Sequence, residues 1–355
     1  MRQFWAIALL ALAIVIVPAS AGAKQGQPYV VHALVSDGAV PAANTDSQLH
    51  NGWGLAATPT SPWWVADNGT NVATLYDSSG NKQSLVVTVG GGPTGEVFNP
   101  TGQFVVHSGT SSGPARFIWA TEDGTVRGWN PGVPPPPPST TSEVAVDDSA
   151  SGAVYKGLAI AVTPDGPRLY TTDFHNGSVD VYDGSWNEVN IPGAFVDPKL
   201  PKGYAPFGIQ TIGTRVFVTY AKQDATAHDE VDGQGLGIVD AYDTAGTLLG
   251  RVATHGQLNA PWGLALAPSS FGPFGGDLLI GNFGDGRINA YEELANGHFE
   301  HRGELRGADS KPVTIDRLWA LEFGNAGSNG NPHTLFFTAG PNDEADGLFG
   351  SITSG

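Results

Sequence analysis

Cysteine is absent from the whole 355-residue chain. No disulfide can therefore stabilise the fold, although small secreted proteins commonly depend on disulfides. The absence also excludes a lipid anchor attached to a cysteine near the N-terminus. A protein of this length must be held together by a sizeable hydrophobic core and by the closure of its architecture.

Charge is scarce, and positive charge especially so. Charged residues make up 14% of the chain, with 17 Lys and Arg against 34 Asp and Glu, which gives a net charge of −17. The sequence contains no basic stripe with interleaved aromatic residues. Such an acidic protein repels phosphate backbones and anionic lipid, so nucleic-acid binding is excluded as a function class. The acidity itself is sufficiently explained by solubility.

Long apolar runs are missing except at the N-terminus. Arg2 precedes an uncharged apolar run over residues 4–17, and Ala21-Gly22-Ala23 then offers the small residues that a signal peptidase recognises. The run is too short to span a membrane comfortably, which takes about 20 apolar residues. We predict that residues 1–23 are a signal peptide, that residues 24–355 form a single domain without a membrane span, and that the protein is secreted or periplasmic.

Glycine and proline are abundant, with 49 and 26 residues, and they indicate many turns. An apolar stretch around a small anchor residue recurs six times, each time followed by a strand, a polar turn and a second strand. The anchors are Gly54, Gly95, Gly157, Gly208, Gly263 and Ala320, at intervals of 41 to 62 residues. Repeated short strands with Gly-rich turns are typical of four-stranded propeller blades. The sequence therefore predicts an all-β, six-bladed β-propeller.

A ring of blades needs its two ends to meet. The strand-like segment over residues 29–35 has no partner in the first repeat, so we expect it to close the last blade beside residues 348–352. A proline-rich run over residues 131–138 lies between the third strand of its blade and a fourth near residues 143–146. Because the repeat resumes after it, this run is predicted to be a stiff surface loop.

Four segments carry a resemblance to a known family. Residues 64–71, 205–210, 218–224 and 281–290 resemble an uncharacterised family of exported bacterial proteins, some of which end in a PEP-CTERM sorting tail. The resemblance extends over nearly the whole chain after the signal peptide and implies no known activity. The Pro-Glu-Pro tail itself is not found here. More broadly, the repeat resembles propellers of the NHL type.

Two sets of residues should converge on one face of a propeller, because the turn between the second and third strands lies on the same side as the start of the first strand. The residues directly before the anchors are Trp53, Thr94, Lys156, Phe207, Trp262 and Trp319. The polar turn residues include Asp67, Asn68, Glu122, Asp123, Asp173, His175, Asp224, Asn282, Asp285, Asn342 and Asp343.

The residues before the anchors suggest a ligand-binding surface. Trp53, Phe207, Trp262 and Trp319 could stack on sugar rings or hold an apolar ligand, with Lys156 as a hydrogen-bond donor. Alternatively, these aromatic side chains fill the channel and pack between blades, since aromatic residues contribute large buried areas.

An enzymatic function would be expected if the residues before the anchors matched those of six-bladed gluconolactonase-type hydrolases. That family places Asn or Asp before the anchor glycine and holds a divalent metal in the channel mouth, whereas this chain has Trp, Thr, Lys or Phe there. Hard cations require several oxygen ligands, which this ring does not supply. Neither a HExxH motif nor a Gly-x-Ser-x-Gly motif is present. The favoured function is a binding or scaffold module for a glycan, peptide or protein. The alternative is a metal-dependent, lactonase-like hydrolase or lyase. The sequence leaves open whether the protein is an enzyme.

One acidic loop, over residues 222–235, greatly lengthens a turn. Besides His228, it carries four acidic residues: Asp224, Asp229, Glu230 and Asp232. These four residues are the candidate metal ligands, with calcium as the candidate ion, although their spacing is not that of an EF-hand. A solvated acidic loop without a metal is the other interpretation.

Overall fold

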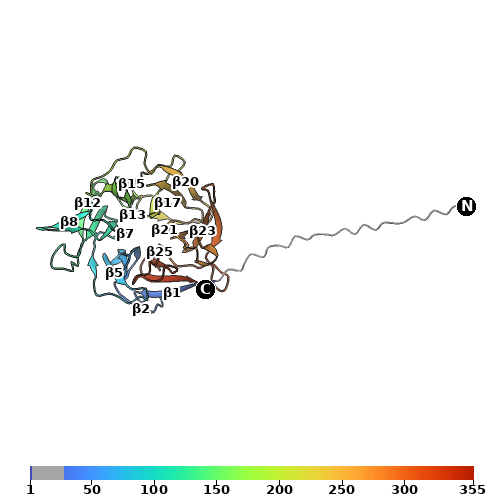
Figure 1. Cartoon of the computed structure of the whole chain (residues 1–355), viewed down its shortest axis with the longest axis horizontal. Helices are drawn as coiled ribbons and strands as arrows, with labels where there is room; N and C mark the ends of the chain where they lie inside the picture. Colours follow the sequence, from blue (N-terminus) through green and yellow to red (C-terminus); the bar gives the residue numbers. More distant parts are fainter. Residues whose placement is uncertain (2–27) are drawn as a thin grey trace.

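Six β-sheets surround a central channel in the computed structural model, which describes Met1 and residues 28–355 (Figure 1). The predicted six-bladed propeller is confirmed. Apart from Met1, the predicted signal peptide lies outside the described residues. Among the residues described, no helix combines the length and apolar character that a membrane crossing requires. Three short 3-10 helices interrupt the loops: η1 (Asn68–Thr70), η2 (Ser149–Ser151) and η3 (Gly272–Phe274).

The first three blades each start with the strand nearest the channel. Blade 1 contains β3 (Gly52–Ala56), β4 (Trp63–Asp67), β5 (Val72–Tyr76) and β6 (Val87–Thr88). Blade 2 contains β7 (Pro93–Phe98), β10 (Phe117–Thr121), β11 (Thr125–Trp129) and β12 (Glu143–Asp147), with an inserted hairpin of β8 (Val105–Ser108) and β9 (Ser111–Pro114). Blade 3 contains β13 (Tyr155–Thr163), β14 (Gly166–Asp173) and β15 (Ser178–Asp183).

The remaining blades follow the same order. Blade 4 contains β16 (Tyr204–Ile212), β17 (Arg215–Gln223), β19 (Ile238–Asp243) and β20 (Leu248–Thr254), with β18 (Glu230–Val231) paired to β17. Blade 5 contains β21 (Pro261–Leu266), β22 (Leu278–Asn282), β23 (Ile288–Glu293) and β24 (Phe299–Glu304). Blade 6 contains β25 (Leu318–Phe323), β26 (Leu335–Ala339), β27 (Leu348–Ser354), β1 (Tyr29–Ser36) and β2 (Asn44–Thr45).

The prediction of four strands in every blade is wrong for blade 3. Its sheet has three strands, and a single bridge between Tyr182 and Glu188 stands where a fourth would begin. The chain beyond this bridge contains Pro192, Pro198 and Pro201. Proline lacks a backbone N–H and cannot donate to a strand ladder, so this segment runs as a loop.

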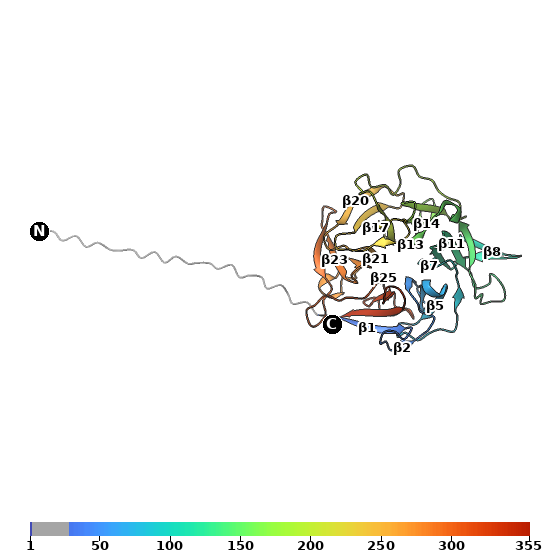
Figure 2. The same ribbon diagram turned by 180° about the vertical axis from the view of Figure 1, so that it is seen from behind.

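The ring is closed by pairing the N-terminal strand with the C-terminal one. Strand β1 runs antiparallel to β27 from the Tyr29–Ser354 pair to the Ser36–Leu348 pair, as predicted. Both views show β1 lying beside the C-terminus (Figures 1 and 2). This pairing covers the edge of β27, which would otherwise be a template for association with another chain.

The glycine anchors mark places where neighbouring innermost strands approach closely. A Cβ atom at Gly95 would lie 2.3 Å from the Leu158 nitrogen, and one at Gly208 would lie 2.2 Å from the Trp262 oxygen. Neither distance is compatible with a side chain, and a similar contact exists at Gly263. Glycine therefore recurs at the anchors because the backbones pack too tightly around the channel for a Cβ atom.

Candidate functional site

Lys156 and Glu122 meet at the face where the innermost strands begin, which we call the channel-mouth face. Lys156 lies at the start of β13, and Glu122 lies in the turn between β10 and β11. Lys156 Nζ is 2.6 Å from Glu122 Oε1 and 3.3 Å from Asp229 Oδ1. The lysine is 1% exposed. The predicted convergence of pre-anchor and turn residues is confirmed for this pair.

Directly beneath Lys156, aromatic rings fill the channel. Trp53 stacks on Trp319 with 3.5 Å between ring centroids, and Trp262 meets both rings edge-on. The centroid of Phe207 lies 5.9 Å from that of Trp319, and Lys156 Nζ lies 5.0 Å from that of Trp53. We call Trp53, Phe207, Trp262 and Trp319 the aromatic plug.

Burial of the aromatic plug decides between the two interpretations of these residues. Trp53, Phe207 and Trp319 are at most 2% exposed, and Trp262 is 9% exposed. A sugar ring needs an exposed aromatic face on which to stack, and these faces contact one another instead. Their packing therefore corresponds to the channel-filling alternative.

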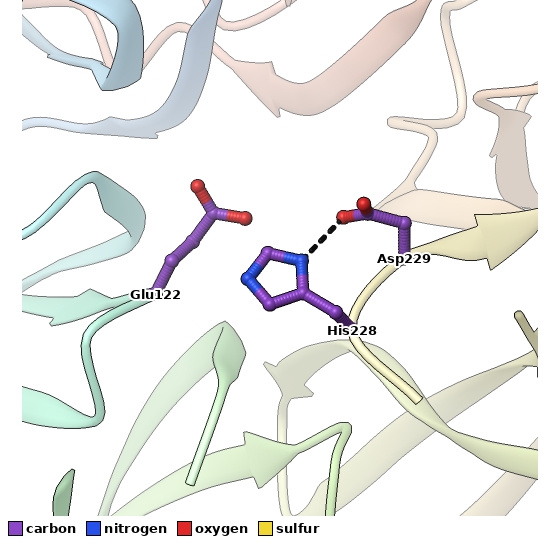
Figure 3. A group of neighbouring side chains, drawn as sticks. All are labelled: Glu122, His228 and Asp229. Atoms are coloured by element: carbon purple, nitrogen blue, oxygen red, sulfur yellow. Dashed lines mark hydrogen bonds and ion pairs between the residues drawn. The ribbon is translucent and has the colours of Figure 1, made fainter. Parts of the chain in front are cut away.

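His228 and Asp229 complete a polar group with Glu122. His228 Nδ1 is 2.8 Å from Asp229 Oδ1, and both residues come from the loop after β17. Asn68 Nδ2 donates to Glu122 Oε2 over 2.8 Å. Figure 3 shows the Glu122 carboxyl directed toward His228 and Asp229 from a separate turn. One ligand atom from each of these three residues lies within 4.8 Å of the others, so the group is a candidate metal site.

Charge is concentrated around the buried lysine. Burial alone would lower the pKa of Lys156, but the carboxylates of Glu122, Glu230 and Asp229 outweigh it and raise that pKa. Burial raises the pKa of Glu230 to about 7 and also raises the pKa of Glu344. The pKa of Asp229 is lowered, because Lys156 and His228 outweigh the effect of its partial burial. Glu122 and Asp229 thus pair with the buried ammonium, and Glu230 and Glu344 interact with its charge from farther away.

Neighbouring contacts fix the edge of this polar group. Asn51 Nδ2 donates to Glu344 Oε2 over 2.8 Å, while its Oδ1 accepts the Trp319 indole N–H over 2.9 Å. Arg317 pairs with Asp232 at 2.9 Å and with Asp343 at 2.7 Å. Asn51 therefore links Trp319 of the aromatic plug to the Glu344 carboxyl by hydrogen bonds.

The four candidate metal ligands of the acidic loop do not converge. Asp224 accepts hydrogen bonds from Thr226 and His228 and shapes its own turn. Asp232 is paired with Arg317, and Glu230 lies in β18. Only Asp229 of the four belongs to the candidate metal group, because pairing of β18 with β17 directs the loop back over Lys156.

Glu122 and His228 were missed as candidate ligands. Glu122 directly follows β10 as Asn68 directly follows β4, and this equivalence within the repeat was the available signal. His228 gave no such signal, since its place depends on the path of a loop without a counterpart in other blades. Chemically, a carboxylate-paired histidine can exchange protons, and the surrounding carboxylates can bind a cation.

The fold defines the chain as a six-bladed β-propeller. Virginiamycin B lyase from Staphylococcus aureus superposes with a TM-score of 0.51 at 12% identity, covering 92% of this chain and 99% of that one. A streptogramin B lyase structure gives 0.52 at 9% identity, covering 93% and 98%. At such low identity, the likeness establishes the fold alone.

More similar relatives come from Acanthamoeba polyphaga mimivirus. Its uncharacterized protein R648 is 34% identical over 342 residues, covering 91% of this chain and 80% of the viral protein. Its uncharacterized protein L690 is 31% identical over 342 residues, covering 91% and 85%. The chain belongs to the family of these uncharacterised proteins. No protein-family model matches it, and these viral relatives do not support the bacterial exported family suggested by the sequence motifs.

Proposed function

We propose that the protein is an exported binding propeller. Its channel-mouth face would hold a peptide or protein segment by contacting a basic side chain of that segment. The observation that carries this proposal is the pairing of one buried lysine, Lys156, with both Glu122 and Asp229; the carboxyl groups of Glu230 and Glu344 add to the negative potential there. Lys156 compensates part of their charge. The remaining negative charge favours a positively charged group on the ligand.

Two features favour a peptide or protein over a glycan. The aromatic plug has almost no exposed ring surface for a sugar. It also fills the channel beneath Lys156, so a ligand rests on the face and does not enter the channel. The partly exposed Asp229 and His228 remain accessible for contact there. Residues 1–23 would direct export, in keeping with their signal-peptide pattern.

A matched pair of peptides tests this proposal. A short peptide containing lysine and the same peptide with acetyl-lysine are titrated against the protein by fluorescence anisotropy. We expect the charged peptide to bind more tightly, by about tenfold or more, and to weaken with added salt. Equal affinity for both peptides, or no binding to a panel of basic peptides, would reject the proposal.

Variants locate the binding on the channel-mouth face. Glu122→Gln and Asp229→Asn preserve side-chain size while removing a charge, and each should weaken binding of the lysine peptide. Glu292→Gln is the control, because Glu292 lies in β23 and pairs with Arg302. If the control weakens binding as much as the two variants, the binding is a non-specific effect of net charge.

A metal-dependent hydrolase or lyase is the second candidate, favoured by the Glu122, His228 and Asp229 group. Lys156 argues against a metal there, since its ammonium already contacts two of the three residues. A divalent cation would have to displace that ammonium or share its carboxylates. We expect calcium, manganese and zinc to bind Lys156→Met better than the original protein. Tight binding of one metal to the original protein, abolished by Glu122→Gln, would favour the enzyme.

A further inference from the structure

Strand β1 forms the outer edge of blade 6 over most of its length and lies at the rim of the ring (Figures 1 and 2). Its inner side pairs with β27, whereas β2 pairs with its outer side only at Val35 and Ser36. The stretch over residues 29–33 therefore directs one side of its backbone outward without a neighbouring strand. Val30 and Val31 are 41% and 40% exposed there. An exposed apolar edge is a template for pairing with another chain.

Two hydrogen bonds define which backbone groups of this stretch face outward. The Tyr29 N–H donates to the Arg306 oxygen, and the Ala33 oxygen accepts the Ala43 N–H. Because backbone groups alternate in direction along a strand, Tyr29, Val31 and Ala33 all face away from β27. Four of their groups have no partner within residues 28–355: the Tyr29 oxygen, the N–H and the oxygen of Val31, and the Ala33 N–H.

These four groups are complementary to those of a second copy of the chain. In an antiparallel pair centred on Val31, the two Val31 residues exchange both of their backbone bonds, and each Ala33 N–H meets the Tyr29 oxygen of the other copy. The remaining groups of that pair, the Tyr29 N–H and the Ala33 oxygen, already have partners within each chain. A twofold contact therefore satisfies every outward backbone group of the stretch.

The side chains of β1 also suit a second copy. The strand contains neither Asp, Glu, Lys nor Arg, in a chain whose net charge is −17. Two molecules of such charge repel each other, and an uncharged strand is the part of the surface where their approach costs least. Pairing centred on Val31 places two β-branched side chains directly opposite each other, which is a favourable cross-strand arrangement.

The outer edges of the other blades are protected in ways that β1 is not. Charged side chains, very short strands, prolines and covering loops are the usual protections of a sheet edge. Strand β6 is two residues long, and a loop with three prolines stands at the edge of blade 3. The outer strands of blades 2, 4 and 5 carry charged residues, namely Glu143, Asp147, Arg251, Glu300, Arg302 and Glu304. Of these outer strands, β1 alone combines eight residues with neither charge nor proline.

We propose that two copies of this chain associate by antiparallel pairing of their β1 strands about a twofold axis at Val31. The blade 6 sheets of both copies then form one continuous sheet. The unpaired backbone groups account for the alignment of the two strands, and the absence of charge accounts for the choice of this edge. The inference is independent of the function proposed above, because it uses no residue of the channel-mouth face.

Sedimentation equilibrium of the chain starting at Lys24, from about 1 µM to about 200 µM, measures the association. We expect a reversible transition to twice the protomer mass, maintained or strengthened by added salt, because salt screens the repulsion between the acidic copies. Val31→Lys places two like charges opposite each other and should stay monomeric. Val162→Lys, at a position 66% exposed in β13, is the matched control and should associate as the original protein does. The protomer mass at every concentration overturns the inference and leaves the edge to a strand of another protein.

A cysteine at position 31 tests the alignment, because the chain has no cysteine of its own. Opposite residues that exchange both backbone bonds have Cα atoms about 5.5 Å apart, a separation that a disulfide can bridge. Val31→Cys should therefore form a covalent dimer on mild oxidation, seen on a non-reducing gel, whereas Val162→Cys should not under the same conditions. Circular dichroism checks that each variant is folded. Equal cross-linking at both positions, or a dimer retained by folded Val31→Lys, would overturn the assignment to β1.

Discussion

Trp53 and Trp319 stack face to face with their ring centroids 3.5 Å apart, and they join the first blade to the last. Trp53 belongs to β3 and Trp319 to β25, so this contact secures the seam of the ring at its centre. Toward the outer rim, the ring is closed by the pairing of the N-terminal strand β1 with β27 within the last blade. Closure thus depends on aromatic contacts between the first and last blades and on one strand pair from opposite ends of the chain.

The central contact should contribute strongly to stability. Trp319→Ala removes a fully buried ring and the indole donor to Asn51, and it should lower the free energy of unfolding by about 3–5 kcal/mol. Trp319→Phe keeps a ring but loses the hydrogen bond, so its loss should be smaller. Urea unfolding followed by tryptophan fluorescence and circular dichroism measures both. Leu249→Ala, at a position 54% exposed, is the control and should change stability by less than about 0.5 kcal/mol. A loss in the free energy of unfolding below about 1 kcal/mol for Trp319→Ala would mean that the central aromatic contact contributes little to stability.

The rim contact should be needed for both stability and solubility. A chain starting at Asp37 lacks β1, leaves the backbone of β27 unpaired and removes Val35, which is 1% exposed, from the core. We expect a markedly lower melting temperature and self-association through the free edge. Size-exclusion chromatography and thermal unfolding detect these effects. A chain starting at Pro28 retains the pairing and should behave as a monodisperse protein; if both chains behave alike, β1 is dispensable.

The fold could be predicted because its constraints recur in the sequence. Close approach of the innermost strands demands glycine at Gly95 and Gly208, and this demand recurs around the ring. The unpaired N-terminal strand indicated the closure in the same way. The fourth strand of blade 3 was predicted incorrectly, because the spacing of anchors says nothing about whether the outermost segment can form a ladder.

The site was less predictable because it depends on side-chain partners. Lys156 was identified from its position before an anchor, but its partner Glu122 was one of many polar turn residues. The position of His228 follows from the pairing of β18 with β17, which has no equivalent in the repeat.

Replacement of Lys156 tests the electrostatic balance of the channel-mouth face. Lys156→Met keeps much of the apolar stem but leaves Glu122, Asp229, Glu230 and Glu344 without their shared cation. The pKa values of Asp229 and Glu230 should both rise, because the lysine now lowers them. The variant should be less stable than the original protein at pH 7, and the difference should shrink as acid protonates the carboxyl groups.

Unfolding curves for both proteins at pH 7 and pH 5 measure this change. Lys82→Met is the control. Lys82 lies between β5 and β6 and pairs with Asp46, which follows β2, so this ion pair does not involve the carboxyl groups around Lys156. A deficit of Lys156→Met that is the same at both pH values would show that lost packing, and not unshared negative charge, causes the instability.

Buried acids should make the protein more stable at mildly acidic pH. Burial raises the pKa of both Glu230 and Glu322 to about 7. Each acid therefore holds a proton in the folded state that it loses on unfolding at neutral pH. Its stabilising contribution is complete below its ordinary pKa and is lost as pH rises through about 7. The free energy of unfolding should consequently fall between about pH 5 and pH 8, by no more than about 3 kcal/mol for each group.

Glu322→Gln isolates the contribution of one of these two acids. The amide does not titrate, so the variant should show a shallower decline in stability over that pH range, with the largest gain over the original protein at the alkaline end. Asp46 has the opposite tendency: although partly buried, it has a lowered pKa because of Lys82 and Tyr76, and its contribution is lost only below about pH 4. The window from about pH 5 to pH 8 therefore reports on the raised acids. Urea unfolding at four pH values measures the slope. An unchanged slope in Glu322→Gln would mean that this carboxyl group is ionised in the folded protein at neutral pH.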